Sequence, residues 1–205
     1  MRARNIISWV VSLVMIGAGV ALMASFFLNQ GSTDSTATNS ANPSGFNVPE
    51  LGTTQTTGAS GPKDKTLKLT IPAMKRVENA KVPNATGNDR KALDSSTAIH
   101  LAGTGFPWQK VANVYIAGHR LGYPNTDSFL SFYDLDSLKN GDKVFVTDAS
   151  GEKYTYRVFK EMVVGPTDLH VTDPVPGKNV VTLQSCTLPD YSKRLIVQAE
   201  LVDKA

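Results

Sequence analysis

The stretch VVTLQSCTLPDYSKRLIVQAEL, Val180 to Leu201, contains two apolar runs separated by a polar loop. Both runs are rich in Val, Ile, Leu and Thr, which favour strands, and the loop holds Pro, Asp and Ser, which favour turns. The only cysteine of the 205 residues, Cys186, ends the first run, and Arg194 opens the second. A hairpin of these two strands would bring both side chains to the same rim of a sheet.

Similar short runs fill the rest of the chain from about Thr66 onward, and turn signals such as NGD, ASG and PGK separate them. Val, Ile, Thr, Tyr and Phe dominate these runs, which predicts strands joined by tight turns. Helix is scarce, with a turn or two expected in residues 128–138 and another in residues 87–98. We therefore predict an all-β barrel or sandwich, with strands at Leu67–Ile71, Asn113–Gly118, Lys143–Asp148, Lys153–Val164, Asn179–Cys186 and Arg194–Val202.

The amino-terminal part has a different character, because residues 6–28 contain no charged side chain. A helix of this length reaches about 34 Å, which is enough to cross the hydrocarbon core of a bilayer. A cleaved signal peptide is the alternative, but the apolar run is longer than such segments usually are. Arg2 and Arg4 precede the run, so the positive-inside rule places the amino end in the cytoplasm and the remainder outside the cell. We predict a single-pass membrane anchor over residues 1–28.

Residues 29–65 consist mainly of Gly, Ser, Thr, Asn and Pro and contain few large apolar groups. Such a segment cannot bury enough apolar surface to offset the entropy lost on ordering, so it is expected to be a flexible linker. The predicted organisation is therefore an anchor over 1–28, a linker over 29–65 and an extracellular domain over 66–205.

The charge balance excludes some function classes. The net charge of +3 includes Arg2 and Arg4, and the remaining chain carries 19 Lys and Arg against 18 Asp and Glu. Nucleic-acid binding would need basic residues clustered on one face, so we expect no such partner. The scattered Asp134, Asp136 and Asp142 do not follow a calcium-loop template, and we expect neither a metal nor a cofactor.

A cysteine is nucleophilic only as the thiolate, so Cys186 would need a cationic or imidazole neighbour. His100 and His170 lie in Pro-, Gly- and Thr-rich surroundings and are interpreted as polar surface groups. His119 follows the apolar run VYIAG, whose Gly118 permits the close approach of another backbone. We therefore expect His119 at a strand tip, where a catalytic base would be held in place.

Arg194 is the candidate for stabilising an oxyanion, because a fixed guanidinium supplies donors before charge develops. The alternative is that Arg194 is a solvated end group of its strand. Arg120 competes for the same role on weaker grounds.

Three motifs together resemble the sortases, membrane-anchored cysteine transpeptidases of Gram-positive bacteria. They are IAGHR at residues 116–120, TLQSC at residues 182–186, and an Arg eight positions beyond the cysteine. The resemblance covers roughly Leu67 to Val202 and includes LTIPAM and VVGPTDLHV. It departs from the family at Ser185, where sortases usually carry Thr.

The resemblance implies an eight-stranded barrel, antiparallel or mixed, in which Cys186, His119 and Arg194 form the catalytic set. Cys186 would cleave an LPXTG-like sorting signal between Thr and Gly through a thioester, and the bound surface protein would pass to a cell-wall amine. GHRLGYP is most similar to class E enzymes of actinobacteria, which are associated with LAXTG signals. Tyr123, Ser185 and Thr187 are the candidates for substrate binding.

Pilus-building sortases carry an Asp-Pro-aromatic lid ahead of the barrel, and residues 29–65 contain no such tripeptide. The string LAGTG at residues 101–105 resembles a sorting signal, but it lies inside the predicted domain and is interpreted as loop structure.

Two other functions remain open. An L,D-transpeptidase also uses Cys and His, but those proteins resemble one another through an S-x-G-C pattern that is not present here. A tethered β-domain that binds cell wall or protein partners, with Cys186 buried and inert, is the non-catalytic alternative.

Overall fold

The computed structural model describes residues 61–205. The predicted membrane anchor and residues 29–60 of the predicted linker lie outside the described residues. No helix within residues 61–205 is both long and apolar enough to span a bilayer. Residues 61–65, the end of the predicted linker, lie against the domain, with Gly61 facing the Trp108 indole and Lys65 Nζ 4.8 Å from the centroid of that ring system.

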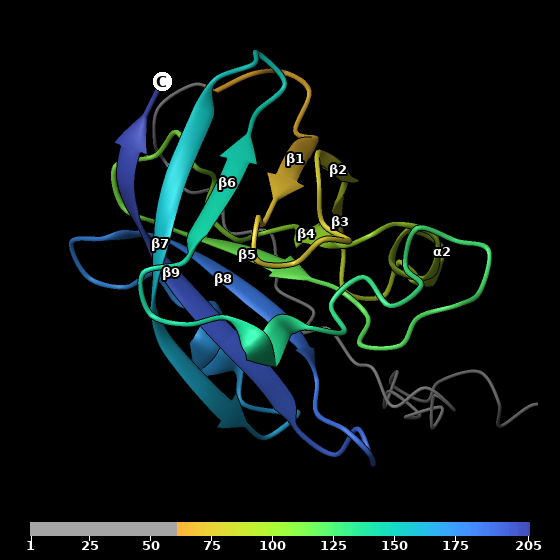
Figure 1. Ribbon diagram of the computed structural model, residues 1–205. Coiled ribbons are helices and arrows are strands. Elements are labelled where there is room, and N and C mark those ends of the chain that lie inside the picture. Colours follow the sequence, from red (N-terminus) through yellow and green to blue (C-terminus); the bar gives the residue numbers. More distant parts are fainter. Residues whose placement is uncertain (1–60) are drawn as a thin grey trace, which may run out of the picture. The chain divides into compact units, whose positions relative to one another are not determined.

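Residues 61–205 form one nine-stranded sheet of order β2-β1-β6-β7-β9-β8-β5-β4-β3. Figure 1 shows the long strands β7, β8 and β9 side by side, with α2 beyond the end of β5. The strands are β1 Leu67–Thr70, β2 Ala80–Val82, β3 Asn84–Ala85, β4 Ile99–Leu101, β5 Ala112–Ala117, β6 Lys143–Thr147, β7 Lys153–Val164, β8 Asn179–Cys186 and β9 Arg194–Lys204. The helical elements are α2 Arg90–Ser95 and the 3-10 turns η1 Leu135–Ser137 and η2 Leu169–Thr172.

The two edges of this sheet, β2 and β3, are consecutive in the chain and only Pro83 separates them. Proline has no backbone N–H to donate to a ladder, so a strand is interrupted at this position. The Pro83 carbonyl accepts a hydrogen bond of 2.9 Å from the N–H of His100, the middle residue of β4. The two edges of the sheet are thus joined covalently at Pro83, and the sheet forms a nearly closed barrel.

The predicted all-β barrel with few helices is confirmed, but the number of strands differs from the prediction. Nine strands are present instead of eight, because β2 and β3 are separate short segments. The sheet is mixed, since β5 pairs in parallel with β8 and β3 in parallel with β4. The six expected strands all occur with boundaries shifted by at most two residues, whereas β2, β3 and β4 were not expected.

Strands β5, β8 and β9 are buried on both faces where they meet. Alternate side chains of β5 enter two apolar clusters, Val114 and Ile116 the larger and Tyr115 and Ala117 the smaller. All eight residues of β8 are buried, and Cys186 lies in the smaller cluster. Successive side chains of a strand point to opposite faces, so this pattern fixes which residues can meet at the strand ends.

Candidate active site

The three predicted catalytic residues meet at the ends of β5, β8 and β9. Every parallel pair from Ala112↔Asn179 to Ala117↔Gln184 has an offset of 67 residues. The same offset, continued two residues beyond β5, sets His119 opposite Cys186. Cys186 in turn pairs directly with Arg194 across the antiparallel β8–β9 ladder. The barrel topology therefore brings these residues to neighbouring positions at one rim.

Two hydrogen bonds carry the register past the end of β5. The Gly118 N–H donates to the Gln184 carbonyl at 3.0 Å, and the Ser185 hydroxyl donates to the Gly118 carbonyl at 2.9 Å. A side chain at Gly118 could not fit, because its Cβ would lie 2.9 Å from the Thr97 carbonyl oxygen. Gly118 thus allows His119 to leave the strand beside Cys186.

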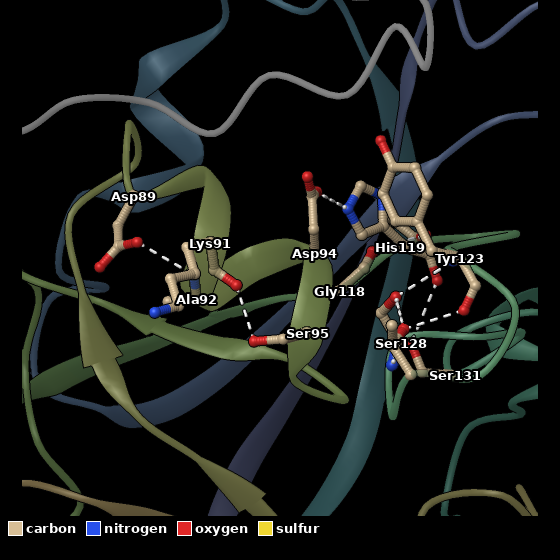
Figure 2. A network of polar contacts seen from close by, with 12 residues as sticks. Asp89, Lys91, Ala92, Asp94, Ser95, Gly118, His119, Tyr123, Ser128 and Ser131 are labelled. Carbon is tan, nitrogen blue, oxygen red and sulfur yellow. Dashed lines mark hydrogen bonds and ion pairs between the residues drawn. The ribbon is translucent and has the colours of Figure 1, made fainter.

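The His119 side chain is buried and is hydrogen-bonded to Asp94 of α2. The Nε2 atom lies 2.8 Å from Asp94 Oδ1, and the imidazole makes a T-shaped contact with the Tyr123 ring at 5.5 Å between centroids (Figure 2). Burial lowers the pKa of His119, while the Asp94 carboxylate opposes that shift. Since a carboxylate only accepts, the imidazole hydrogen is on Nε2 and Nδ1 is the nitrogen that accepts a proton.

The segment after His119 is held firmly in place. The His119 carbonyl accepts hydrogen bonds from the Phe132 N–H at 3.1 Å and the Ser131 hydroxyl at 3.3 Å. Gly122 has φ +61°, and a Cβ there would lie 2.0 Å from the Ser128 carbonyl. Only glycine fits this turn, which directs Tyr123 back toward the His119 ring (Figure 2).

Cys186 and Arg194 are both almost fully buried, at 1% and 3% exposure. Burial raises the pKa of the Cys186 thiol to about 11, and the positive charges of Arg194 and Arg120 oppose that shift. Arg194 Nη1 donates to the carbonyls of Tyr191 at 3.0 Å and Lys193 at 3.1 Å. The guanidinium is therefore fixed at the rim by the backbone of the β8–β9 loop.

A pocket of about 170 Å³ opens beside these groups. His119 and Cys186 line the same pocket, so the imidazole and the thiol share one cavity. The other lining residues are Arg120, Leu121, Gly122, Tyr123 and Tyr191. Within residues 61–205, no three His, Cys, Asp or Glu side chains come together as metal ligands.

The three predicted substrate-binding residues occupy different environments. Tyr123 lines the pocket and is partly exposed. Thr187 pairs with Lys193 through a backbone hydrogen bond of 3.1 Å and so closes the β8–β9 loop. Ser185 is fully buried, and its hydroxyl supports Gly118 instead of facing the pocket. This hydrogen bond needs only a hydroxyl, so Ser can take the place of the Thr that the resemblance led us to expect at position 185.

The interpretation of His100 as a surface group is wrong. It lies in β4 and is fully buried, with Nδ1 2.9 Å from Asn84 Oδ1 and Nε2 2.9 Å from the Gly105 carbonyl. Burial lowers its pKa to about 4. His170 is exposed in η2, as expected.

Sequence reasoning also missed Asp94. It lies 25 positions before its partner His119, in a six-residue helix whose amino end is capped by Asp89. This helix lies within residues 87–98, where a helical turn was expected, but no local pattern signals which acidic residue meets a distant histidine.

Comparisons with known proteins identify the family of this chain. The sortase domain family model matches residues 69–202, well over half of the chain. Sortase A of Streptococcus agalactiae serotype III (strain NEM316) is 38% identical over 89 residues, which are 43% of this chain and 36% of that protein. Sortase A of Bacillus anthracis is 35% identical over 91 residues, 44% and 40% of the two chains. The matched stretches thus span well under half the length of these curated relatives.

Solved structures are similar over a larger part of the chain. Sortase A from Corynebacterium diphtheriae has a TM-score of 0.58 and 29% identity, over 68% of this chain and 61% of that one. Sortase C1 from Streptococcus agalactiae has a TM-score of 0.57 and 33% identity, over 71% of both chains. Family model, relatives and barrel lead to one conclusion: this chain belongs to the sortase domain family.

Proposed function

We propose that the chain is a cysteine transpeptidase that cleaves a sorting signal of the LAXTG or LPXTG kind between Thr and Gly. The product would be transferred to an amine of a peptidoglycan precursor. The observation that carries this proposal is the 67-residue offset, which places His119 opposite Cys186 while Arg194 pairs with Cys186. A nucleophile and a base that share one pocket, with a fixed cation paired to the nucleophile across the ladder, are the groups that acyl transfer requires.

In the first half of the reaction, the Cys186 thiol gives its proton to His119, and the sulfur attacks the carbonyl carbon of the substrate Thr. The raised pKa of Cys186 and the lowered pKa of His119 favour a neutral pair before substrate binds. The C–N bond then breaks, the imidazolium returns its proton to the departing glycine amine, and a thioester remains.

In the second half, an amine attacks the thioester carbonyl and loses a proton to His119. The C–S bond breaks, the new amide leaves, and the sulfur recovers the proton as a thiol. Arg194 would stabilise the negative oxygen formed in both halves, because the loop carbonyls of Tyr191 and Lys193 keep its guanidinium at the rim beforehand.

Tyr123 is the best-placed candidate to contact the sorting signal, since it lies in the pocket wall against His119. Thr187 would act by shaping the β8–β9 loop and Ser185 by supporting Gly118. We also propose a class E assignment, surface proteins with carboxyl-terminal sorting signals as substrates, and a single-pass membrane location with the catalytic domain outside the cell.

The test uses the full chain, LAXTG and LPXTG peptides, an amine acceptor, and mass measurement of the products. Wild-type protein is expected to form the transpeptidation product and a thioester on Cys186. Cys186→Ala should abolish both while the thermal unfolding temperature changes little. Cleavage by Cys186→Ala at the wild-type rate would refute the mechanism.

The alternative function is a tethered β-domain without catalysis, and one observation favours it. Cys186 is 1% exposed and its thiol pKa is raised to about 11, as for an inert buried cysteine. A methanethiosulfonate reagent should modify native Cys186 and abolish activity if the chain is an enzyme. A binding domain would leave the thiol unmodified until it unfolds.

A further inference from the structure

Arg120 follows His119 directly and is the arginine among the residues that line the pocket. The sequence motif did not assign it a role beyond competing with Arg194. In the structure it is 6% exposed and lines the same cavity as Cys186. Burying a guanidinium costs free energy unless its charge is compensated, so the groups around Arg120 need to be considered.

The two sides of the Arg120 guanidinium have unequal partners. Nη2 donates to Asp136 Oδ2 at 2.5 Å, and Cζ lies 5.8 Å from the centroid of the Tyr133 ring. Nε is buried and has no hydrogen-bond partner among the described residues. Asp136 itself is 56% exposed, so solvent screens much of its negative charge. Arg120 therefore brings net positive charge into the pocket wall.

The charges of the groups around Cys186 can be stated one by one. Arg194 approaches from β9, while His119 and Arg120 approach from the segment after β5. Tyr115 lies in the same apolar cluster, and Tyr123 and Tyr191 line the pocket. The phenol of Tyr115 is kept neutral because burial raises its pKa. The guanidinium groups of Arg194 and Arg120 are thus the permanent charges beside the thiol.

We propose that Arg120 is a positioning residue that favours the thiolate of Cys186, with Asp136 holding its guanidinium and partly offsetting its charge. This inference rests on the proposed nucleophilic role of Cys186. Arg194 pairs with Cys186 and would act on the substrate oxyanion, whereas Arg120 acts through the sulfur alone. The positive charges of Arg194 and, to a smaller extent, Arg120 oppose the rise in the thiol pKa that burial causes, so Arg120 adds to an effect on the sulfur that Arg194 also exerts.

The arrangement makes two substitutions act in opposite directions. Arg120→Met removes the positive charge and should disfavour the thiolate. Asp136→Asn leaves Arg120 uncompensated and should favour it. Arg120→Lys keeps the charge but loses the fork that pairs with Asp136. A purely structural role of this ion pair would instead make the first two variants behave alike, since both break the same contact.

The experiment measures the rate of alkylation of Cys186 by iodoacetamide against pH, with the full chain in detergent micelles. The thiolate attacks the methylene carbon and iodide leaves, so the rate follows the ionised fraction. For Arg120→Met we expect a shift of about one pH unit upward, or about tenfold slower alkylation at pH 8. Arg120→Lys should stay within about threefold of wild type, and Asp136→Asn should react about threefold faster.

An Arg120→Met profile that matches wild type, or shifts of Arg120→Met and Asp136→Asn in the same direction, would overturn the proposal. If Arg120→Met does not fold, Asp136→Asn and Arg120→Lys still decide it, because faster alkylation by the Asn variant is required. The profile needs no peptide substrate. Wild-type protein that fails to cleave peptides would refute the proposed function, yet the alkylation data would still test Arg120.

A second readout separates Arg120 from Arg194. If Arg120 acts only through the sulfur, Arg120→Met should slow transpeptidation and alkylation by similar factors. Arg194→Lys should slow transpeptidation far more than alkylation, because the loss of a planar fork affects the oxyanion while the charge beside the thiol remains. A loss of transpeptidation in Arg120→Met that far exceeds its loss of alkylation would count against a role through the sulfur.

Discussion

His100 and His119 lie on neighbouring segments of the same barrel wall, and both are buried, but their surroundings differ in kind. His100 is enclosed between Asn84 and the Gly105 carbonyl, and its ring lies 4.5 Å from that of Phe106. His119 meets the carboxylate of Asp94 and lines a cavity with Cys186. Burial alone therefore does not distinguish a structural histidine from a catalytic one.

The two histidines differ in the hydrogen-bond partners of their rings and in their access to a cavity. Neutral partners and a closed site keep the His100 imidazole uncharged, which suits a group that joins β3, β4 and the following turn. The carboxylate partner of His119 stabilises its protonated form, and the open cavity lets a substrate exchange protons with the ring. The first histidine holds the barrel edge together, and the second faces the proposed chemistry.

Replacing each histidine in turn gives the largest expected difference between the two sites. His119→Ala should reduce kcat/KM for peptide cleavage about 1000-fold, which is the scale of lost general acid–base catalysis. His100→Gln, measured per folded molecule, should stay within about twofold of wild type. Single-turnover cleavage with circular dichroism as a folding control measures both. A comparable catalytic loss in His100→Gln would remove the distinction.

His119 lies just beyond the end of a strand, as expected from the sequence, whereas His100 is buried where a surface position was expected, and the reason is physical. His119 follows a run of apolar residues that forms a six-residue strand, and Gly118 marks the close approach of β8. Strand β4 has only three residues, and its partner β3 has two. Strands this short carry no detectable alternation, so His100 resembled a loop residue.

The same contrast applies to the remaining elements. Cys186 and Arg194 end and begin strands of eight and eleven residues, whose composition was sufficient to place them on one rim. The parallel pairing of β5 with β8 joins segments 67 positions apart, and no local signal specifies it. The Asp94–His119 contact depends on how α2 packs on the barrel, which is likewise a tertiary property.

Arg194→Lys tests whether the rim beside His119 needs geometry as well as charge. Lysine retains the positive charge but cannot reproduce the guanidinium fork held by the Tyr191 and Lys193 carbonyls. We expect kcat to fall about 100-fold with a smaller change in KM, since oxyanion stabilisation acts in the transition state. A variant with wild-type kcat, measured by steady-state transpeptidation, would exclude Arg194 from the mechanism.

Protonation of His100 should make the free energy of unfolding depend on pH. Its folded pKa of about 4 lies below the ordinary 6.5, so the unfolded chain binds the proton more readily. His100 therefore contributes stability above pH 6.5 that is lost as the pH falls toward 4, by about 3 kcal/mol at most.

Urea unfolding at pH 7 and pH 4.5 measures this change, and His100→Gln is the control because it cannot titrate. The wild-type free energy of unfolding should fall more than that of the variant between the two pH values, since the same carboxylates titrate in both proteins. Equal falls would show that His100 does not couple folding to protonation.

Asp94→Asn is the smallest change and the most specific test of the His119 site. The carboxylate opposes the fall in the His119 pKa that burial causes, so its removal should lower that pKa further. The acidic limb of the kcat/KM profile should then move to lower pH, and the maximal rate should fall about tenfold as the imidazolium is less well stabilised. Asp89→Asn is the matched control, because it removes the same charge from the same helix.

Asp89 accepts from the Ala92 N–H at the helix start, and Asn also serves as an amino-terminal cap, so α2 should persist in the control. If both variants shift the profile equally, the effect is the general loss of one negative charge near the site. If Asp94→Asn alone shifts it, the hydrogen bond to Nε2 is what distinguishes His119 from His100. The ring of His119 is bonded to a carboxylate, whereas the ring of His100 is bonded to an amide oxygen and a backbone carbonyl.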